Sequence, residues 1–438
     1  MKELVKSSGL VAVARILGIV LQGLTVIYLA RSLPVDRMGV YALCYALLGF
    51  ARTMGPFGID QIAMRRVAVL KDERGHTELH RFLNTGIVLT VALNLLPCVA
   101  ALVAGGLSRG WLQRHNISLP DFTILICTVP AYSLIGLMTA IARGFERNVL
   151  AQFPDSVLLQ AIFGAGLLAH HATGITLPIT LLWQALSAWI VVAVYVAILV
   201  WIGMDMHAGV CWQECAKLVR EGRHIFSALV VTSLSIRAPI LISAPLLGAA
   251  ATAVLDVASR FGTLPTVTTS SVSTTFSPQF AILLRQNERK ALSRAYSLAS
   301  LLAGIPAVLC LMGIVLFAPL IVRLALPPVY TKAILPMFLV ALATTINAVF
   351  GISSSLIFMA GRSSVVTGYS LAQLITVCLL SVALGLKWGP TGIACGVAVG
   401  AVVRDFGAAL WVGKAFGVDI PPFGWRKGAP KGELEQAQ

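Results

Sequence analysis

The stretch Ala46–Arg66, ALLGFARTMGPFGIDQIAMRR, places Arg52 inside an apolar run that is long enough to enter a membrane. An arginine at the centre of a membrane helix costs about 2.5–3.5 kcal/mol on insertion scales, and such residues almost always face a bundle interior or a water-filled cavity. Four more arginines lie in apolar runs elsewhere: Arg15, Arg237, Arg260 and Arg404. The pattern therefore predicts membrane helices that carry functional charge.

The composition is that of a membrane protein with many spans. Of the 438 residues, 58% are hydrophobic and only 12% are charged, whereas about 25% are charged in a typical soluble domain. The mean hydropathy is +0.87. The formal net charge is +15, but the basic residues form short clusters between apolar runs, as they do in cytoplasmic loops. This distribution indicates a membrane protein and not a partner of nucleic acid.

A spanning helix needs about 20 mainly apolar residues. By this measure the chain is an all-α polytopic membrane protein with about twelve transmembrane helices. The predicted spans are 8–30, 39–58, 83–107, 121–142, 150–170, 176–202, 224–246, 249–283, 292–318, 333–360, 364–386 and 390–413.

Lys and Arg residues concentrate in every second connector, which predicts that both chain ends are cytoplasmic. The connector 203–223 divides the predicted spans into two sets of six. We therefore predict an N-terminal six-helix bundle over 1–202, a cytoplasmic linker over 203–223, a C-terminal six-helix bundle over 224–413 and a cytoplasmic tail over 414–438.

The second and eighth predicted spans share a local pattern. Each places an arginine after an apolar run and a proline about one turn later, as Arg52 with Pro56 and Arg260 with Pro265. Two halves of equal helix number and matching orientation are typical of parallel repeats in transporters. The sequence thus predicts an internal repeat.

Arginine is a permanent cation whose planar fork matches two phosphate oxygens at once. Arg52, Arg237 and Arg260 lie deep in their spans, and we expect them to line a cationic, substrate-binding cavity. Arg15 is the fourth predicted member, with snorkelling to the headgroups as the alternative, and snorkelling is favoured for Arg404. Such a cavity favours an anionic substrate, most naturally a phosphate or diphosphate.

Several uncharged polar residues fall on the same helical faces as these arginines or on a neighbouring polar face. We predict that they form a secondary lining of the cavity: Gln22, Tyr45, Thr263 and Asn347. Packing between helices by small and hydroxyl residues is the alternative explanation, and it is favoured for the face that carries Asn347.

Carboxylates are scarce in the predicted spans. Asp256 lies one turn before Arg260 and can pair with it. Asp60 and Asp256 are candidates either for coupling to an ion or for such pairing. Asp155 is expected near a membrane interface, and Asp405 is expected to face away from its neighbour Arg404. The predicted cavity is therefore net positive.

Motifs for other chemistry are missing. The sequence contains no phosphate-binding loop of an ATPase, no H-E-x-x-H motif and no cysteine pattern with zinc spacing. The predicted outer loops are too short to fold as a catalytic domain. We therefore predict no enzyme, no catalytic residue, no metal site and no cofactor, with Na⁺ or H⁺ as the candidate coupling ion.

A family resemblance covers about fifty residues, Ala14–Ala63, ARILGIVLQGLTVIYLARSLPVDRMGVYALCYALLGFARTMGPFGIDQIA. The stretch resembles the N-terminal signature of bacterial polysaccharide flippases (O-antigen or Wzx-type) of the multidrug/oligosaccharidyl-lipid/polysaccharide (MOP) exporter superfamily. The matching pieces are the arginine in the first helix, the G-V-Y after the outer loop and the G-I-D-Q before a basic pair.

This resemblance implies two six-helix bundles around a central cationic cavity (a MATE-like fold) that work by alternating access. It implies a polyprenyl-diphosphate-linked oligosaccharide as substrate, carried from the cytoplasmic to the outer leaflet of the bacterial inner membrane. Related flippases of lipid-linked peptidoglycan precursors place cavity arginines on helices 1, 2 and 8, the helices that hold Arg15, Arg52 and Arg260 here. A polysaccharide polymerase is a candidate partner.

Two other functions remain open at this stage. An ion-coupled drug or metabolite antiporter of the same superfamily would favour a cavity lined by acids and aromatic residues. A membrane enzyme such as a polysaccharide polymerase would need large outer loops. Neither accounts for Arg52 together with Arg260, so the flippase is the leading hypothesis.

Overall fold

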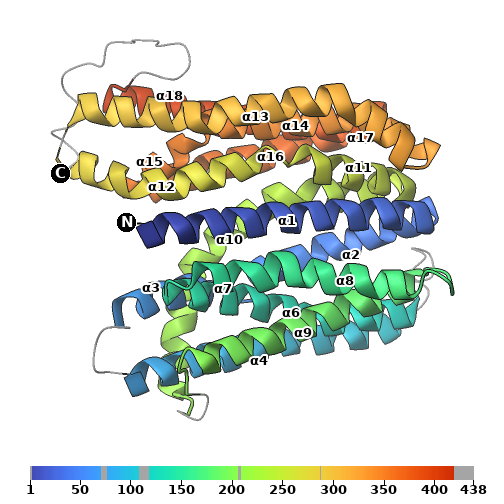
Figure 1. The fold of residues 1–438 in the computed structure, drawn as a ribbon, viewed down its shortest axis with the longest axis horizontal. Helices are drawn as coiled ribbons and strands as arrows, with labels where there is room; N and C mark the ends of the chain where they lie inside the picture. The colour runs from blue at the N-terminus through green and yellow to red at the C-terminus, as the bar shows by residue number, and fades with distance from the viewer. Residues whose placement is uncertain (1, 71–75, 108–117, 206–208, 287, 419–438) are drawn as a thin grey trace. The chain divides into compact units, whose positions relative to one another are not determined.

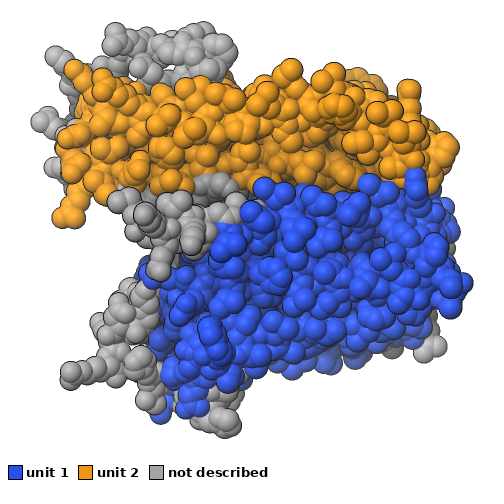
Figure 2. All heavy atoms as spheres, viewed as in Figure 1, with its two compact units in different colours: residues 1–237 blue, residues 238–438 orange. Residues whose placement is uncertain are grey.

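The computed structural model describes residues 2–70, 76–107, 118–205, 209–286 and 288–418. Throughout these ranges the chain is helical and contains no strand. It forms two compact units, residues 1–237 and 238–438, which are coloured separately in Figure 2. Within each unit the long helices lie side by side as a bundle (Figure 1).

The N-terminal unit contains α1 (Lys2–Ser32), α2 (Val35–Met54), α3 (Ile59–Leu70), α4 (His76–Leu107), α6 (Leu119–Gly144), α7 (Asn148–Phe153), the π-helix η1 (Pro154–Leu158), α8 (Leu159–Ala169), α9 (Leu177–Trp201) and most of α10 (Trp212–Leu247). The C-terminal unit contains α11 (Ala249–Gly262), α12 (Thr266–Arg285), α13 (Arg289–Ala325), the 3₁₀-helix η2 (Pro328–Ala333), α14 (Ile334–Phe350), α15 (Ile352–Met359), α16 (Ser363–Trp388), α17 (Pro390–Ala401), the π-helix η3 (Val402–Phe406) and α18 (Gly407–Phe416).

Ten helices are long and apolar enough to cross a membrane, and the bent pair α2 and α3 brings the number to eleven among the described residues. These helices correspond to all but one of the predicted spans. The remaining one, 249–283, is divided into α11 and α12, because the helix is interrupted before Thr266 and α12 begins with the hydroxyl-rich run TVTTSSVSTT. The predicted all-α polytopic membrane fold is confirmed.

The boundary between the compact units falls inside α10, between Arg237 and Ala238. The division predicted at the connector 203–223 separates two sets of spans, and it stays a prediction. Because α10 begins at Trp212, the second half of that connector is helical and continues into the seventh span. Most of the predicted tail 414–438 lies outside the described residues.

Large apolar side chains cover the outside of the bundles. On α13, for example, Leu309, Leu316 and Leu324 are 62%, 66% and 70% exposed. A soluble monomer rarely exposes a continuous apolar surface of this kind, whereas lipid tails solvate it. The polar and charged side chains discussed below are instead drawn into the bundles.

The span that carries Arg52 is broken between α2 and α3, with a bend of 47°. The break is the sequence Gly55–Gly58, GPFG, in which Pro56 has no backbone donor. Gly58 has a φ of 80° and Phe57 a φ of 54°. The second value is uncommon for a bulky residue, and the Phe57 ring stacks on Phe226 at 4.3 Å between centroids.

Side chains of neighbouring helices satisfy the backbone at this break. Ser133 Oγ on α6 donates to the Ala51 carbonyl (3.1 Å), and Asn94 Nδ2 on α4 donates to the Gly55 carbonyl (2.9 Å). Broken membrane helices are tolerated where protein groups replace the lost hydrogen bonds in this way.

The C-terminal unit repeats this arrangement between α11 and α12. Thr344 Oγ1 on α14 donates to the Gly262 carbonyl (2.8 Å) at the end of α11. Arg260 lies two residues before the end of α11, as Arg52 lies two residues before the end of α2. Both units therefore end a helix just after an arginine, and in both a hydroxyl group of a neighbouring helix donates to a carbonyl beside the break.

Arg404 and Asp405 form a buried ion pair in η3. Arg404 Nε contacts Asp405 Oδ1 at 2.7 Å, and Nη2 contacts Oδ2 at 3.0 Å. Gln373 Oε1 accepts a further bond from Arg404 (3.1 Å), and Asn347 Nδ2 donates to Asp405 Oδ2 (3.1 Å). The prediction that Asp405 faces away from Arg404 is wrong, because the long arginine side chain folds back along the π-helix to reach it.

We expect this pair to stabilise the fold. Replacing Arg404 or Asp405 singly by Leu should lower the thermal unfolding midpoint of the detergent-solubilised protein, because removing one partner of a buried pair costs about 3–5 kcal/mol. The double replacement by Leu should recover most of the loss, since it leaves no unpaired charge. Single variants as stable as the wild type would contradict this role.

Candidate functional site

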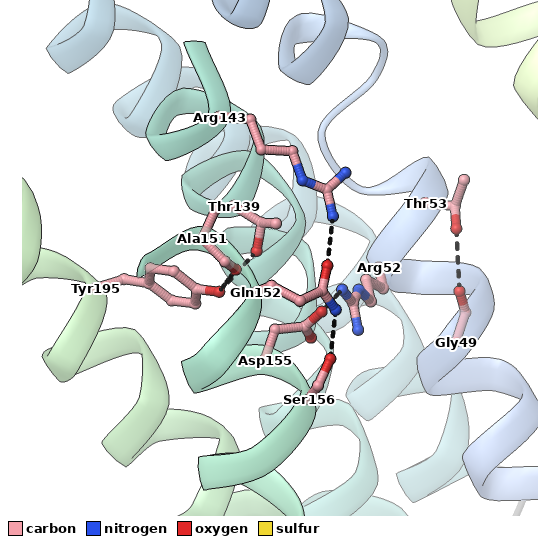
Figure 3. A network of polar contacts seen from close by, with 10 residues as sticks. All are labelled: Gly49, Arg52, Thr53, Thr139, Arg143, Ala151, Gln152, Asp155, Ser156 and Tyr195. Carbon is pink, nitrogen blue, oxygen red and sulfur yellow. Dashed lines mark hydrogen bonds and ion pairs between the residues drawn. The ribbon is translucent and has the colours of Figure 1, made fainter. Parts of the chain in front are cut away.

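Arg52 forms an ion pair with Asp155 in the N-terminal unit (Figure 3). Arg52 Nη2, in the last turn of α2, donates to Asp155 Oδ2 in η1. The Asp155 side chain is 5% exposed and that of Arg52 is 32% exposed. The carboxylate is therefore buried, while the Arg52 side chain stays partly exposed.

The second oxygen of the Asp155 carboxylate lacks a hydrogen-bond donor among the described residues. Asp155 Oδ1 is buried and accepts no hydrogen bond from the described residues. Buried carboxylate oxygens are usually hydrogen-bonded. The pairing of Asp155 with Arg52 thus uses one of the two oxygens that the carboxylate offers.

The π-helix η1 presents Asp155 toward α2. It begins at Pro154, which has no backbone donor and cannot continue a regular α-helical ladder. Single turns of π-helix inside α-helices are frequent at functional sites. Gln152 Nε2 donates to Ser156 Oγ across this turn, beside Asp155, and Figure 3 shows the three side chains together.

Tyr195 holds the start of the irregular turn from α9. Its hydroxyl donates to the Ala151 carbonyl (2.6 Å) and accepts from Thr139 Oγ1 (3.0 Å). The Tyr195 ring is fully buried. These bonds hold the end of α7, which leads into η1, against α6 and α9 (Figure 3).

Two further arginines lie near η1. Arg143, in the last turn of α6, donates through Nη2 to Gln152 Oε1 at 3.2 Å. Arg15 lies on α1, which packs against η1. The Ser156 backbone packs directly against Gly18, one turn after Arg15. Three helices thus bring arginines to η1.

Arg237 lies against the same helix as Arg52. Its guanidinium packs on Gly49, one turn before Arg52 in α2, where a side chain larger than hydrogen would overlap it. Arg237 is half-buried in α10. The structure therefore places Arg15, Arg52 and Arg237 of the predicted set in the N-terminal unit.

Arg260 belongs to the C-terminal unit and pairs with Asp256. Arg260 Nε contacts Asp256 Oδ2 at 2.8 Å, with side chains that are 11% and 8% exposed. Thr263 Oγ1 donates to the Arg260 carbonyl at 3.1 Å and so caps the end of α11. Both aspartates that pair with the deep arginines are buried.

The other predicted residues have diverse partners. Gln22 Nε2 donates to the Tyr45 hydroxyl (3.0 Å), which joins α1 to α2 two turns before Arg52. Asn347 bonds Asp405, as described above. Asp60, in the first turn of α3, accepts from Gln61 Nε2 (2.8 Å).

The pairing of Asp155 with Arg52 was not predicted from the sequence, and Arg143 lies just outside the predicted span 121–142. Arg52 and Asp155 are 103 positions apart in the sequence, so no helical spacing rule could predict that they pair. The available signal was the polar run of Gln152, Asp155 and Ser156 in the fifth predicted span. A membrane helix with such a face needs a polar neighbour.

Solved structures with a similar fold are transporters and a flippase. An inward-facing multidrug resistance MATE transporter of the MOP superfamily has a TM-score of 0.74 and 14% identity, over 92% of this chain and 98% of that chain. The lipid II flippase MurJ, in an inward closed conformation, has a TM-score of 0.73 and 15% identity, over 92% of this chain and 87% of that chain.

A MOP superfamily transporter from Pyrococcus furiosus, described as having a binding pocket of reversed polarity, has a TM-score of 0.66 and 15% identity, over 93% and 94% of the two chains. At these identities the likeness concerns the fold. No curated protein matches the chain.

A family model described as polysaccharide biosynthesis protein matches residues 4–284. This region includes the broken α2–α3 span, the whole Arg52–Asp155 network and α11 with Arg260. It covers well over half of the 438 residues. The chain therefore belongs to the polysaccharide biosynthesis protein family.

Proposed function

We propose that the protein is a flippase for polyprenyl-diphosphate-linked oligosaccharide, such as an O-antigen or related polysaccharide repeat unit. It would carry this lipid from the cytoplasmic to the outer leaflet of a bacterial inner membrane by alternating access. The family supports a role in polysaccharide synthesis, and the fold is shared with the lipid II flippase MurJ.

The observation that carries the proposal is the gathering of arginines in the membrane part of the N-terminal unit. Arg52 is partly exposed beside η1, Arg143 bonds Gln152 just before that turn, and Arg15 lies on α1, which packs against η1. Permanent cations at this depth suit a substrate with concentrated negative charge, and a diphosphate accepts the bidentate bonds that guanidinium groups offer.

The prenyl tail and the saccharide of the substrate would cross the membrane in different surroundings. The prenyl tail stays in lipid, and the saccharide crosses in water beside polar helix faces. Arg260, which lies in the C-terminal unit, is a further cation that we propose binds substrate. The driving force would be an ion gradient, the membrane potential or removal of the flipped product, with Asp60 and Asp256 as candidate sites for Na⁺ or H⁺. No bond is made or broken.

An ion-coupled drug or metabolite antiporter is the second candidate, because the MATE fold is as similar as that of MurJ. Such a protein would transport cationic drugs more readily with acids than with arginines at the site. The arginines therefore favour the flippase. A polysaccharide polymerase in the same membrane is the candidate partner that would consume the product.

The leaflet distribution of lipid-linked saccharide tests the proposal. In cells lacking the protein, we expect saccharide to accumulate on the cytoplasmic leaflet, and wild-type protein should cure this. Arg52→Ala and Arg260→Ala should each abolish transport while the protein still inserts, and Arg52→Lys should restore only part, because an ammonium lacks the fork.

Arg147→Ala is the matched control, since Arg147 is exposed and lies just after α6. It should transport normally. Normal export by both cavity variants would contradict the role of the arginines. A normal leaflet distribution in cells that lack this protein and any redundant flippase would move the assignment to the antiporter.

Cytoplasmic location of both chain ends is a separate expectation from the Lys and Arg distribution. Fusions of a reporter that fluoresces only in the cytoplasm should be bright at either end. A reporter active only outside the cytoplasm should be silent at both ends. The reverse pattern at one end would require an odd number of spans.

A further inference from the structure

We infer that Asp155 occupies part of the phosphate site in the empty protein, and that a bound diphosphate displaces it from Arg52, with Arg143 as a further phosphate ligand. This inference rests on the proposed function, and it assigns a role to two residues of the same site. It follows from a difference between two ion pairs in the number of hydrogen bonds that their carboxylate oxygens accept.

Asp155 and Asp405 make an internal comparison. Both lie on π-helices, both are buried and both pair with an arginine. Asp405 receives donors on both oxygens from Arg404 and a further one from Asn347. Asp155 receives Arg52 on one oxygen, and the other is buried without a recorded donor. The second pair is the less saturated one.

The arginine of the less saturated pair, Arg52, is also the most exposed of the three paired arginines. The Arg52 side chain is 32% exposed, against 21% for Arg404 and 11% for Arg260. A ligand can therefore approach Arg52 while Asp155 is still bound. A diphosphate carries more charge and more acceptor oxygens than one carboxylate, so it can replace a single-point contact by a bidentate one.

Arg143 is placed to complete the site. Arg143 is exposed at the end of α6, and it donates to Gln152, a neutral acceptor, at 3.2 Å. Exchanging a neutral acceptor for a phosphate oxygen strengthens the bond. Because Gln152 also bonds Ser156 next to Asp155, Arg143 approaches the position from which the carboxylate would withdraw.

Arg15 limits the penalty of displacement. A buried carboxylate that loses its cation is strongly unfavourable. Arg15 lies on α1, the helix that packs against η1, and its positive charge acts on Asp155. When the diphosphate takes Arg52, Asp155 keeps this second cation. In the empty protein, Asp155 neutralises Arg52, which makes the return step without substrate less costly in the membrane.

Binding of farnesyl diphosphate to the full-length protein in lipid nanodiscs tests the inference. Asp155→Asn removes the competing charge and should bind the probe about tenfold more tightly, while Arg143→Gln should bind it about tenfold more weakly. Asp155→Glu, which keeps a carboxylate, should resemble the wild type. Arg147→Gln is the matched control and should leave the affinity unchanged.

Two further ligands, farnesyl monophosphate and farnesol, test whether the site senses the phosphate groups. Farnesyl monophosphate should bind more weakly than the diphosphate and should respond less to Asp155→Asn. Farnesol should be insensitive to both Asp155→Asn and Arg143→Gln. Equal responses for all three probes would overturn the inference, because the prenyl chain and not the phosphate would then be sensed.

The outcomes separate this inference from the proposed function. Unchanged or weaker binding of the diphosphate by folded Asp155→Asn would overturn the inference even if saccharide is flipped normally. If this variant does not fold, Arg143→Gln decides, and an affinity within about twofold of Arg147→Gln overturns the site. Absence of binding by the wild type would also overturn it, whatever the leaflet assay gives.

Discussion

A guanidinium group inside a membrane needs a counter-charge or access to water, and this constraint organises the interior of the protein. Arg52, Arg260 and Arg404 each meet it with an aspartate that is buried in its own unit. The pairs are not equivalent, because both oxygens of Asp405 receive donors, whereas one oxygen of Asp155 receives Arg52 and the other receives none from the described residues. The same requirement thus produces one saturated pair and one pair that we propose exchanges its anion.

Irregular backbone is what brings these groups together. Asp155 and Asp405 lie on π-helices, and Arg52 and Arg260 lie just before helix breaks. Such irregularities survive in a membrane only where protein groups satisfy the freed backbone. At the α2–α3 break the Asn94 amide does so for the Gly55 carbonyl, and at the α11–α12 break the Thr344 hydroxyl does so for the Gly262 carbonyl. Charged groups and irregular backbone therefore occur together in each unit.

The helix breaks after Arg52 and Arg260 are a feature that both units share and that bears on the proposed transport. Each unit ends a helix two residues after an arginine, and a side chain of α6 or α14 donates to a carbonyl beside the break. We expect a bend at this position to let one half of the span move while the arginine stays with the other half. In a protein that works by alternating access, this would couple the anion site to the opening of one side.

The sequence by itself determined the fold class, the position of eleven spans, the family and the residue type that dominates the site. These follow from composition and from periodic patterns within single helices, which are local properties. The i,i+4 pairing of Arg260 with Asp256 is local in the same way. Only the tertiary structure decided that Asp155 pairs with Arg52, that Arg143 joins them and that Arg404 folds back on Asp405. These contacts depend on which helices are neighbours and on where a helix widens, and neither is encoded in the spacing of residues along one span.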